Sequence, residues 1–179
     1  MKETLRYLID SLGSAVDQVD VEMAEALVSR LLDAKRVFVY GVGRSGLVAK
    51  MLAVRLVQLG MDVHFVGDST TPIVTADDLV LVVSSTGGTM SAVQTANIAG
   101  RVGACVVGIT SNRNSKLAHA ADLLITIKIE ESAERPIHAP LGTLFEIASL
   151  TFLDSLVPLL MSRLGQDESA MKSRHAIWV

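Results

Sequence analysis

The sequence predicts an α/β protein in which a parallel sheet is covered by helices on both faces, a three-layer α-β-α sandwich. From Arg36 onward, short runs rich in β-branched residues alternate with segments of helical periodicity. These runs are apolar at successive positions, which is typical of strands buried on both faces of a parallel sheet. We expect the strands near residues 37–40, 63–66, 79–83, 105–109 and 123–127.

Helical spacing of apolar residues predicts the elements around these strands. The first 34 residues carry two helical patterns, and Asp20 is placed to cap the second helix. Between the expected strands, we expect helices near residues 45–59, 88–102 and 113–120.

The C-terminal part of the chain is predicted to begin with a loop and continue as a long helix. The loop is the polar stretch Glu130–Pro140, and an apolar segment of about residues 141–164 follows it. Pro158 should kink this helix, because proline cannot donate the backbone hydrogen bond of a helix interior. We expect one domain over residues 1–179, made of N-terminal helices (1–34), an α/β core (35–165) and a C-terminal tail (166–179).

Composition excludes several classes of protein. The chain has 179 residues, 20% of them charged and 4% aromatic, with a net charge of −3 and no basic cluster, so we expect no binding to nucleic acid. The N-terminus lacks the features of a secretory signal, and we expect no membrane-spanning segment. The single cysteine, Cys105, cannot form an internal disulfide, which fits a cytoplasmic protein.

Ligands of an open parallel sheet bind beyond the carboxyl ends of its strands, so the loops there are candidate sites. The first expected strand is followed by Gly41-Val42-Gly43-Arg44-Ser45-Gly46, which matches the G-x-G-x-x-G dinucleotide pattern. Asp68 lies close to where a ribose-binding acid would be found. The pattern alone fits a nucleotide site and a tight strand-to-helix turn equally well.

The third expected strand is followed by Ser84-Ser85-Thr86-Gly87-Gly88-Thr89. Hydroxyl groups and the backbone N–H groups of a helix start supply the several donors that a phosphate monoester requires. A simple Ser/Thr helix cap is the alternative, but a cap needs only one such residue. The loop therefore predicts phosphate binding.

A third candidate site opens the long C-terminal helix, at Pro140-Leu141-Gly142-Thr143-Leu144-Phe145-Glu146. Thr143 and Glu146 have the spacing of a capping box, which is the structural alternative for this carboxylate. Glu146 is nevertheless set among apolar neighbours, and an apolar wall suits a carboxylate to proton transfer at carbon.

Together these segments resemble the sugar isomerase (SIS) domain family over nearly the whole chain, and within it the 6-phospho-3-hexuloisomerases. The chain departs from the family pattern at a few positions, namely Asp68, Thr86, Gly88 and Ile177-Trp178-Val179. The segments that match are Gly41 to Leu47, Val66-Gly67-Asp68, Thr71-Pro72, Ser84 to Thr89, Pro140 to Glu146, and Arg174-His175-Ala176.

The resemblance implies a five-stranded parallel sandwich of flavodoxin or Rossmann type, an assembly that is usually tetrameric, and no metal or organic cofactor. It implies an isomerase that interconverts D-arabino-hex-3-ulose 6-phosphate and D-fructose 6-phosphate, in the ribulose monophosphate pathway. By resemblance, Ser45 and the loop Ser84 to Thr89 hold the sugar phosphate, Glu146 accepts the proton, and His175 enters a neighbouring subunit's site.

The expected reaction passes through a cis-enediolate, whose negative charge needs preorganised donors. Ser45, Arg44 and the backbone N–H groups of the loops are candidate donors, and the sequence does not rank them. His64, in an apolar strand run, is expected to be structural rather than a proton carrier.

Other functions remain open at this stage. The chain fits another SIS-type aldose–ketose isomerase, a non-catalytic module that binds a phosphosugar, or, from the glycine loop alone, an NAD-dependent enzyme. Because 50% of the residues are hydrophobic, the helices have more apolar surface than one small sandwich buries, so we expect a homo-oligomer.

Overall fold

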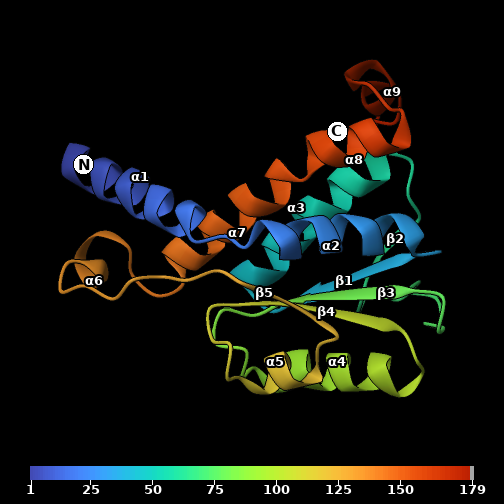
Figure 1. Cartoon of the computed structure of the whole chain (residues 1–179), viewed down its shortest axis with the longest axis horizontal. Coiled ribbons are helices and arrows are strands. Elements are labelled where there is room, and N and C mark those ends of the chain that lie inside the picture. The colour runs from blue at the N-terminus through green and yellow to red at the C-terminus, as the bar shows by residue number, and fades with distance from the viewer. Residues whose placement is uncertain (178–179) are drawn as a thin grey trace.

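The computed structural model describes residues 1–177 and contains a five-stranded parallel sheet between two layers of helices (Figure 1). The strand order is β2-β1-β3-β4-β5. The strands are β1 (Val37–Gly41), β2 (Val63–Phe65), β3 (Leu79–Val83), β4 (Cys105–Thr110) and β5 (Leu123–Thr126). The fold class and the position of every expected strand are confirmed.

Helices cover both faces of this sheet, and the two faces differ in what covers them (Figure 1). The helices α2, α3, α7 and α8 lie on one face, and α1 extends from this layer along α7. The opposite face is covered by α4 and α5. The helices are α1 (Lys2–Asp17), α2 (Val21–Asp33), α3 (Arg44–Gln58), α4 (Met90–Arg101), α5 (Lys116–Ala120), α6 (Arg135–His138), α7 (Thr143–Ser155), α8 (Val157–Leu164) and α9 (Glu168–Ser173).

Strand β3 shows why the apolar runs form buried strands. Leu79 and Leu81 point into the core beneath α3 and α7, whereas Val80 and Val82 point into the core beneath α4. All residues of β3 are buried, because successive side chains of a strand point to opposite faces and both faces are covered.

The local hydrogen bonds at helix ends explain where the helices begin. Two boundaries differ from the expected ones: the start of α5 and the break between α7 and α8. The Asp20 carboxylate accepts hydrogen bonds from the first turn of α2, as expected. Helix α5 begins later than expected because the Ser115 side chain caps it at Ala118 N. The long apolar helix breaks at Leu156, and Pro158 lies in the first turn of α8, where a proline costs no hydrogen bond.

Two short helices were not predicted from the sequence. Helix α6 lies within the expected loop Glu130–Pro140. Helix α9 lies within the C-terminal tail, where Asp167 caps it, and Arg174 Nη1 donates a hydrogen bond to Gln58 O at the end of α3 (3.1 Å). The last two residues, 178–179, lie outside the described residues.

One stretch among the described residues, Thr143–Leu164, is long and apolar enough to cross a membrane when judged by length and composition alone. It consists of α7 and α8, and half of the tested window is buried inside the fold. Helix α7 packs against α3 and α1, so its apolar residues serve the protein core.

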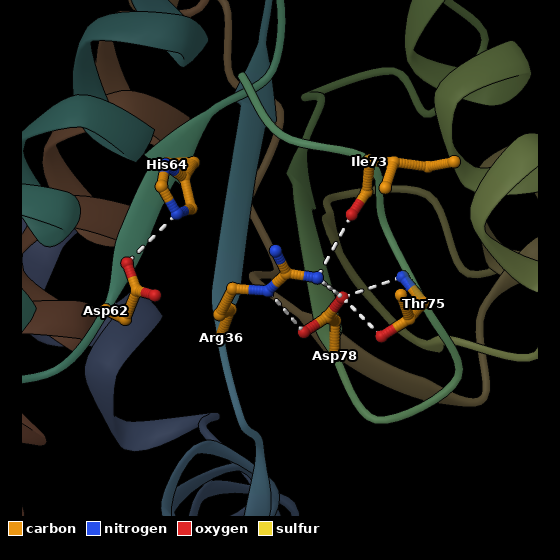
Figure 2. Close-up of polar contacts among 6 residues, drawn as sticks. All are labelled: Arg36, Asp62, His64, Ile73, Thr75 and Asp78. Carbon is orange, nitrogen blue, oxygen red and sulfur yellow. Dashed lines mark hydrogen bonds and ion pairs between the residues drawn. The ribbon is translucent and has the colours of Figure 1, made fainter. Parts of the chain in front are cut away.

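A buried ion pair joins the amino ends of β1 and β3, away from the loops described above (Figure 2). Arg36 Nε and Nη2 donate to the two oxygens of Asp78, at 2.9 and 2.7 Å. Thr75 adds its backbone N–H and its hydroxyl to Asp78 Oδ2, at 2.7 and 2.9 Å. Burial raises the pKa of the Asp78 carboxyl, but these hydrogen bonds outweigh burial and hold the pKa below its usual range.

This pair predicts a loss of stability in acid. Because the pKa of Asp78 is lower in the folded than in the unfolded chain, ionised Asp78 stabilises the fold above its unfolded pKa of about 4. That contribution is lost as the pH falls through the folded pKa. In Arg36→Met the Asp78 carboxylate loses its cation, and we expect urea unfolding at pH 7 to show a lower midpoint than that of the wild type. An unchanged unfolding midpoint at pH 7 would show that the pair does not stabilise the fold.

Candidate active site

The loops after β1 and β3 lie side by side because these two strands pair directly. The register runs from Val37 opposite Leu79 to Gly41 opposite Val83, so both strands end at the same level. Helix α3, which follows β1, and helix α4, which follows β3, cover opposite faces of the sheet. This is the point in the strand order where open α/β sheets form their binding crevice.

The glycine-rich loop after β1 packs tightly against the start of α3. A Cβ at Gly41 would lie 2.8 Å from Gly46 N, and one at Gly46 would lie 2.5 Å from Gly41 O. The strand order is the flavodoxin-like one rather than the classical dinucleotide-binding order. These two glycines therefore serve close packing of strand and helix, which weakens the NAD-dependent alternative.

A cavity of about 110 Å³ lies between the two loops. The structure thus brings Ser45 together with four hydroxyl residues of the β3 loop, whereas Gly87 and Gly88 shape the loop without lining the cavity. Its lining residues are Val42, Ser45, Val83, Ser84, Ser85, Thr86 and Thr89.

The hydroxyl groups of the β3 loop do not cap helix α4. Thr89 precedes the first helical residue, but its side chain makes no cap hydrogen bond. Ser84 Oγ donates instead to Thr89 Oγ1 (3.3 Å), and Thr86 Oγ1 accepts from Gly88 N (3.2 Å). The simple-cap alternative is therefore wrong, and the first-turn N–H groups of α4 point toward the cavity end of the helix without a side-chain acceptor.

Side chains from the end of β4 hold the β3 loop in place. Ser85 O accepts hydrogen bonds from Thr110 Oγ1 (2.9 Å) and from Ser111 N and Oγ (3.0 and 2.8 Å). Ser115 lies directly against Gly87. The sequence analysis missed these three hydroxyl residues, although they follow an expected strand and the strand-end rule applies to them equally.

Glu146 lies in the first turn of α7 with its carboxylate turned toward Arg44. Arg44 Nε donates a hydrogen bond to Glu146 Oε2, and the Glu146 side chain is 11% exposed. The carboxylate passes close over Gly142, where a Cβ would lie 3.0 Å from Oε1. The expected wall around Glu146 is thus apolar only in part, because a cation from the β1 loop reaches it.

The capping-box alternative for Glu146 is wrong. The residue before α7 is Gly142, and no side chain caps the helix. Thr143 Oγ1 donates instead to Pro140 O (2.7 Å). The Glu146 carboxylate therefore does not cap the N-terminus of its own helix.

The two histidines considered from the sequence lie away from Glu146. His175 is exposed and follows α9, which is tied to Gln58 at the C-terminal end of α3. Arg44 is the first residue of the same 15-residue helix, so about 20 Å separate the two ends. His64 pairs with Phe38 in the amino half of β1, and its Nε2 lies 2.9 Å from Asp62 Oδ1. Figure 2 shows the contact between these two side chains as a dashed line. Neither histidine reaches Glu146 within one chain.

Two further expectations concern Asp68 and a metal site. Asp68 is exposed in the turn after β2, where Thr71 Oγ1 donates to Asp68 O (2.7 Å). In the described part of the chain, no three His, Cys, Asp or Glu side chains are grouped so that they could hold a metal ion.

A comparison with known families matches residues 30–153 to the SIS domain. The chain belongs to the SIS domain family. Among curated relatives, the 3-hexulose-6-phosphate isomerase of Methanocaldococcus jannaschii is 36% identical over 84% of this chain and 81% of its own length. The 3-hexulose-6-phosphate isomerase of Bacillus subtilis is 33% identical over 97% and 96% of the two chains.

Solved structures agree with the SIS assignment. A protein of Methanococcus jannaschii, for which a function as 3-hexulose-6-phosphate isomerase has been inferred, superposes with a TM-score of 0.86 at 31% identity. The match covers 96% of this chain and 98% of the other. The resemblance stated from the sequence is thereby confirmed, and the relatives support the expected class of enzyme, a phosphosugar isomerase.

The close contact between Gly87 and Ser115 can be tested with two matched variants, Gly87→Ala and Gly165→Ala. In Gly87→Ala the new Cβ would lie 2.0 Å from Ser115 Oγ, so the β3 loop must move. Gly165 has the same backbone φ (62° against 61°), but a Cβ there meets no atom within 4 Å. We expect Gly87→Ala to weaken the binding of a phosphosugar in calorimetry about tenfold or more, ~1.4 kcal/mol. Gly165→Ala should bind as the wild type does, and equal losses in both variants would contradict a role for the loop.

Proposed function

We propose that this protein interconverts D-arabino-hex-3-ulose 6-phosphate and D-fructose 6-phosphate, with Glu146 as the proton acceptor. The observation that carries the proposal is that a hydroxyl-rich cavity and a buried carboxylate are joined through neighbouring residues at the carboxyl end of β1. Ser45 lines the hydroxyl-rich cavity, and its neighbour Arg44 contacts the buried carboxylate of Glu146. Relatives at 33–36% identity that are named 3-hexulose-6-phosphate isomerases support the same reaction.

The phosphate end of the sugar belongs in the cavity between the β1 and β3 loops. Ser45, Ser84, Ser85, Thr86 and Thr89 offer hydroxyl donors there, and α4 directs its N-terminus to the same place. A phosphate at that position is favoured by the helix dipole and by first-turn N–H groups. An anchored phosphate would fix the position of the sugar carbons relative to the Glu146 carboxylate.

The chemical step is a proton transfer between neighbouring carbons. The 3-ketose is open-chain, because closing its 5-hydroxyl on C3 would give a four-membered ring. The Glu146 carboxylate takes the proton from C2, the C2–H electrons form the C2=C3 double bond, and the carbonyl oxygen on C3 gains negative charge. A proton then moves from the C2 hydroxyl to the C3 oxygen, so that the negative charge lies on the C2 oxygen. The protonated Glu146 returns its proton to C3 while the C2 oxygen becomes the carbonyl, which yields open-chain fructose 6-phosphate.

His175 fits this site only from a second copy of the chain. Its distance from Glu146 within one chain, about the length of α3, leaves a partner subunit as the source. Exposed apolar residues on α1 and α3 support association, and they include Leu5, Ile9, Leu47, Met51 and Val54. We therefore propose a homotetramer acting in the cytoplasm, in the ribulose monophosphate pathway, with His175 moving protons between sugar oxygens.

Glu146→Gln tests the proton acceptor. The amide keeps the size of the side chain but takes up no proton, so we expect kcat to fall by at least about 10²-fold. Binding of fructose 6-phosphate should remain, because the phosphate cavity is intact. Proton exchange followed by NMR in heavy water should show the wild type exchanging the hydrogen on C3 of fructose 6-phosphate and none on C1.

The outcomes separate the alternatives. Exchange at C1 would assign the protein to the aldose–ketose isomerases of the family. Binding of fructose 6-phosphate without exchange at either carbon would favour a non-catalytic module. Full turnover by Glu146→Gln would reject the proposed base.

Mixing two inactive variants tests the shared site. If His175 acts in a partner's site, Glu146→Gln and His175→Ala subunits that exchange in one assembly should create some sites with both groups intact. We expect the mixture to regain activity that neither variant has alone. Activity equal to the sum of the separate variants would place His175 outside the reaction.

A further inference from the structure

Arg44 links the two parts of the proposed site, the phosphate cavity and Glu146. It is the first residue of α3, and the next residue, Ser45, lines the phosphate cavity. Its guanidinium group reaches across to α7 and contacts Glu146. The Arg44 side chain is 66% exposed and that of Glu146 is 11% exposed, so an exposed cation contacts a largely buried carboxylate.

The pair uses only a small part of the hydrogen-bonding capacity of Arg44. Arginine and carboxylate often form two parallel hydrogen bonds, but here the contact is made by Nε alone. Among residues 1–177, neither terminal nitrogen of Arg44 has a protein acceptor. Four N–H bonds of a planar cation beside Glu146 thus remain available to a ligand.

The proposed reaction moves negative charge from Glu146 to the sugar. When Glu146 takes the C2 proton it becomes neutral, and the charge appears on the oxygen of C3. The cation beside Glu146 then loses one anionic partner at the moment when another forms next to it. The attraction between Arg44 and the sugar is therefore stronger in the enediolate than in the bound ketose, and it replaces the attraction that Arg44 loses when Glu146 becomes neutral.

On these grounds, and resting on the proposed function, we propose that Arg44 is a catalytic residue that binds the enediolate oxygens on C2 and C3. The two oxygens are cis and lie close together, and the planar fork of a guanidinium group matches such a pair. Nε keeps the Glu146 carboxylate over the reacting carbons while the terminal nitrogens hold the oxygens. This assigns one group among the donors that the sequence left unranked.

A structural link between α3 and α7 is the competing role, and the chain offers a matched control. Arg55 lies on the same helix and pairs with Asp154 on the same partner helix, Nε to Oδ1 at 3.6 Å. Its side chain is 47% exposed. A role limited to joining the helices would give Arg44→Ala and Arg55→Ala similar effects.

The experiment compares steady-state kinetics of Arg44→Ala, Arg44→Lys and Arg55→Ala with thermal unfolding of each. We expect Arg44→Ala to lose about 10²–10³-fold in kcat, the range for removing one oxyanion donor, with KM for fructose 6-phosphate changed only a few-fold. Arg44→Lys keeps the positive charge but lacks the planar fork of donors, so its kcat should lie between those of the wild type and Arg44→Ala. Millimolar guanidinium chloride should restore part of the activity of Arg44→Ala, and Arg55→Ala should match the wild type.

The results distinguish this inference from the proposed function. No turnover by the wild type on either ketose would reject the proposed function, whatever Arg44 does. An active wild type, an inactive Glu146→Gln and an Arg44→Ala variant with wild-type kcat would overturn this inference alone. A raised KM with unchanged kcat would also overturn it, because Arg44 would then contribute only to ground-state binding.

Discussion

The direct pairing of β1 with β3 is the constraint on which the site depends. Because Gly41 and Val83 end their strands at one level, the loop that carries Ser45 and the loop that begins at Ser84 share one cavity. Their helices leave on opposite faces, so no helix fills the space between the loops. A phosphate there meets hydroxyl groups from both sides and a helix N-terminus.

A second constraint is the packing of α7 on α3, which brings Glu146, a carboxylate from far along the chain, into contact with Arg44 beside the cavity residue Ser45. The energetic cost of burying Glu146 is offset by the cation of Arg44 at its open side. The Glu146 side chain is largely shielded from water in this position, with 11% of it exposed. In the proposed reaction, the strand ends of the sheet would supply the phosphate anchor and the helix layer would supply the reacting group.

The strands were predictable because their apolar runs are local signals, and the hydroxyl-rich loop at the end of β3 was predictable because its residues follow a strand directly. The Arg44–Glu146 pair was not, since it joins residues 102 positions apart and depends on how two helices pack. The contacts of Thr110 and Ser115 with the β3 loop depend on tertiary structure in the same way. Helix α9 was missed because its few residues carry too short an apolar pattern to indicate a helix.

A crystal structure with fructose 6-phosphate bound tests the central claim most directly. The account predicts the phosphate among the hydroxyl groups between the β1 and β3 loops, with C3 of the open-chain sugar about 3–3.5 Å from a Glu146 oxygen. A phosphate bound elsewhere, or a Glu146 carboxylate turned away from the sugar carbons, would contradict it.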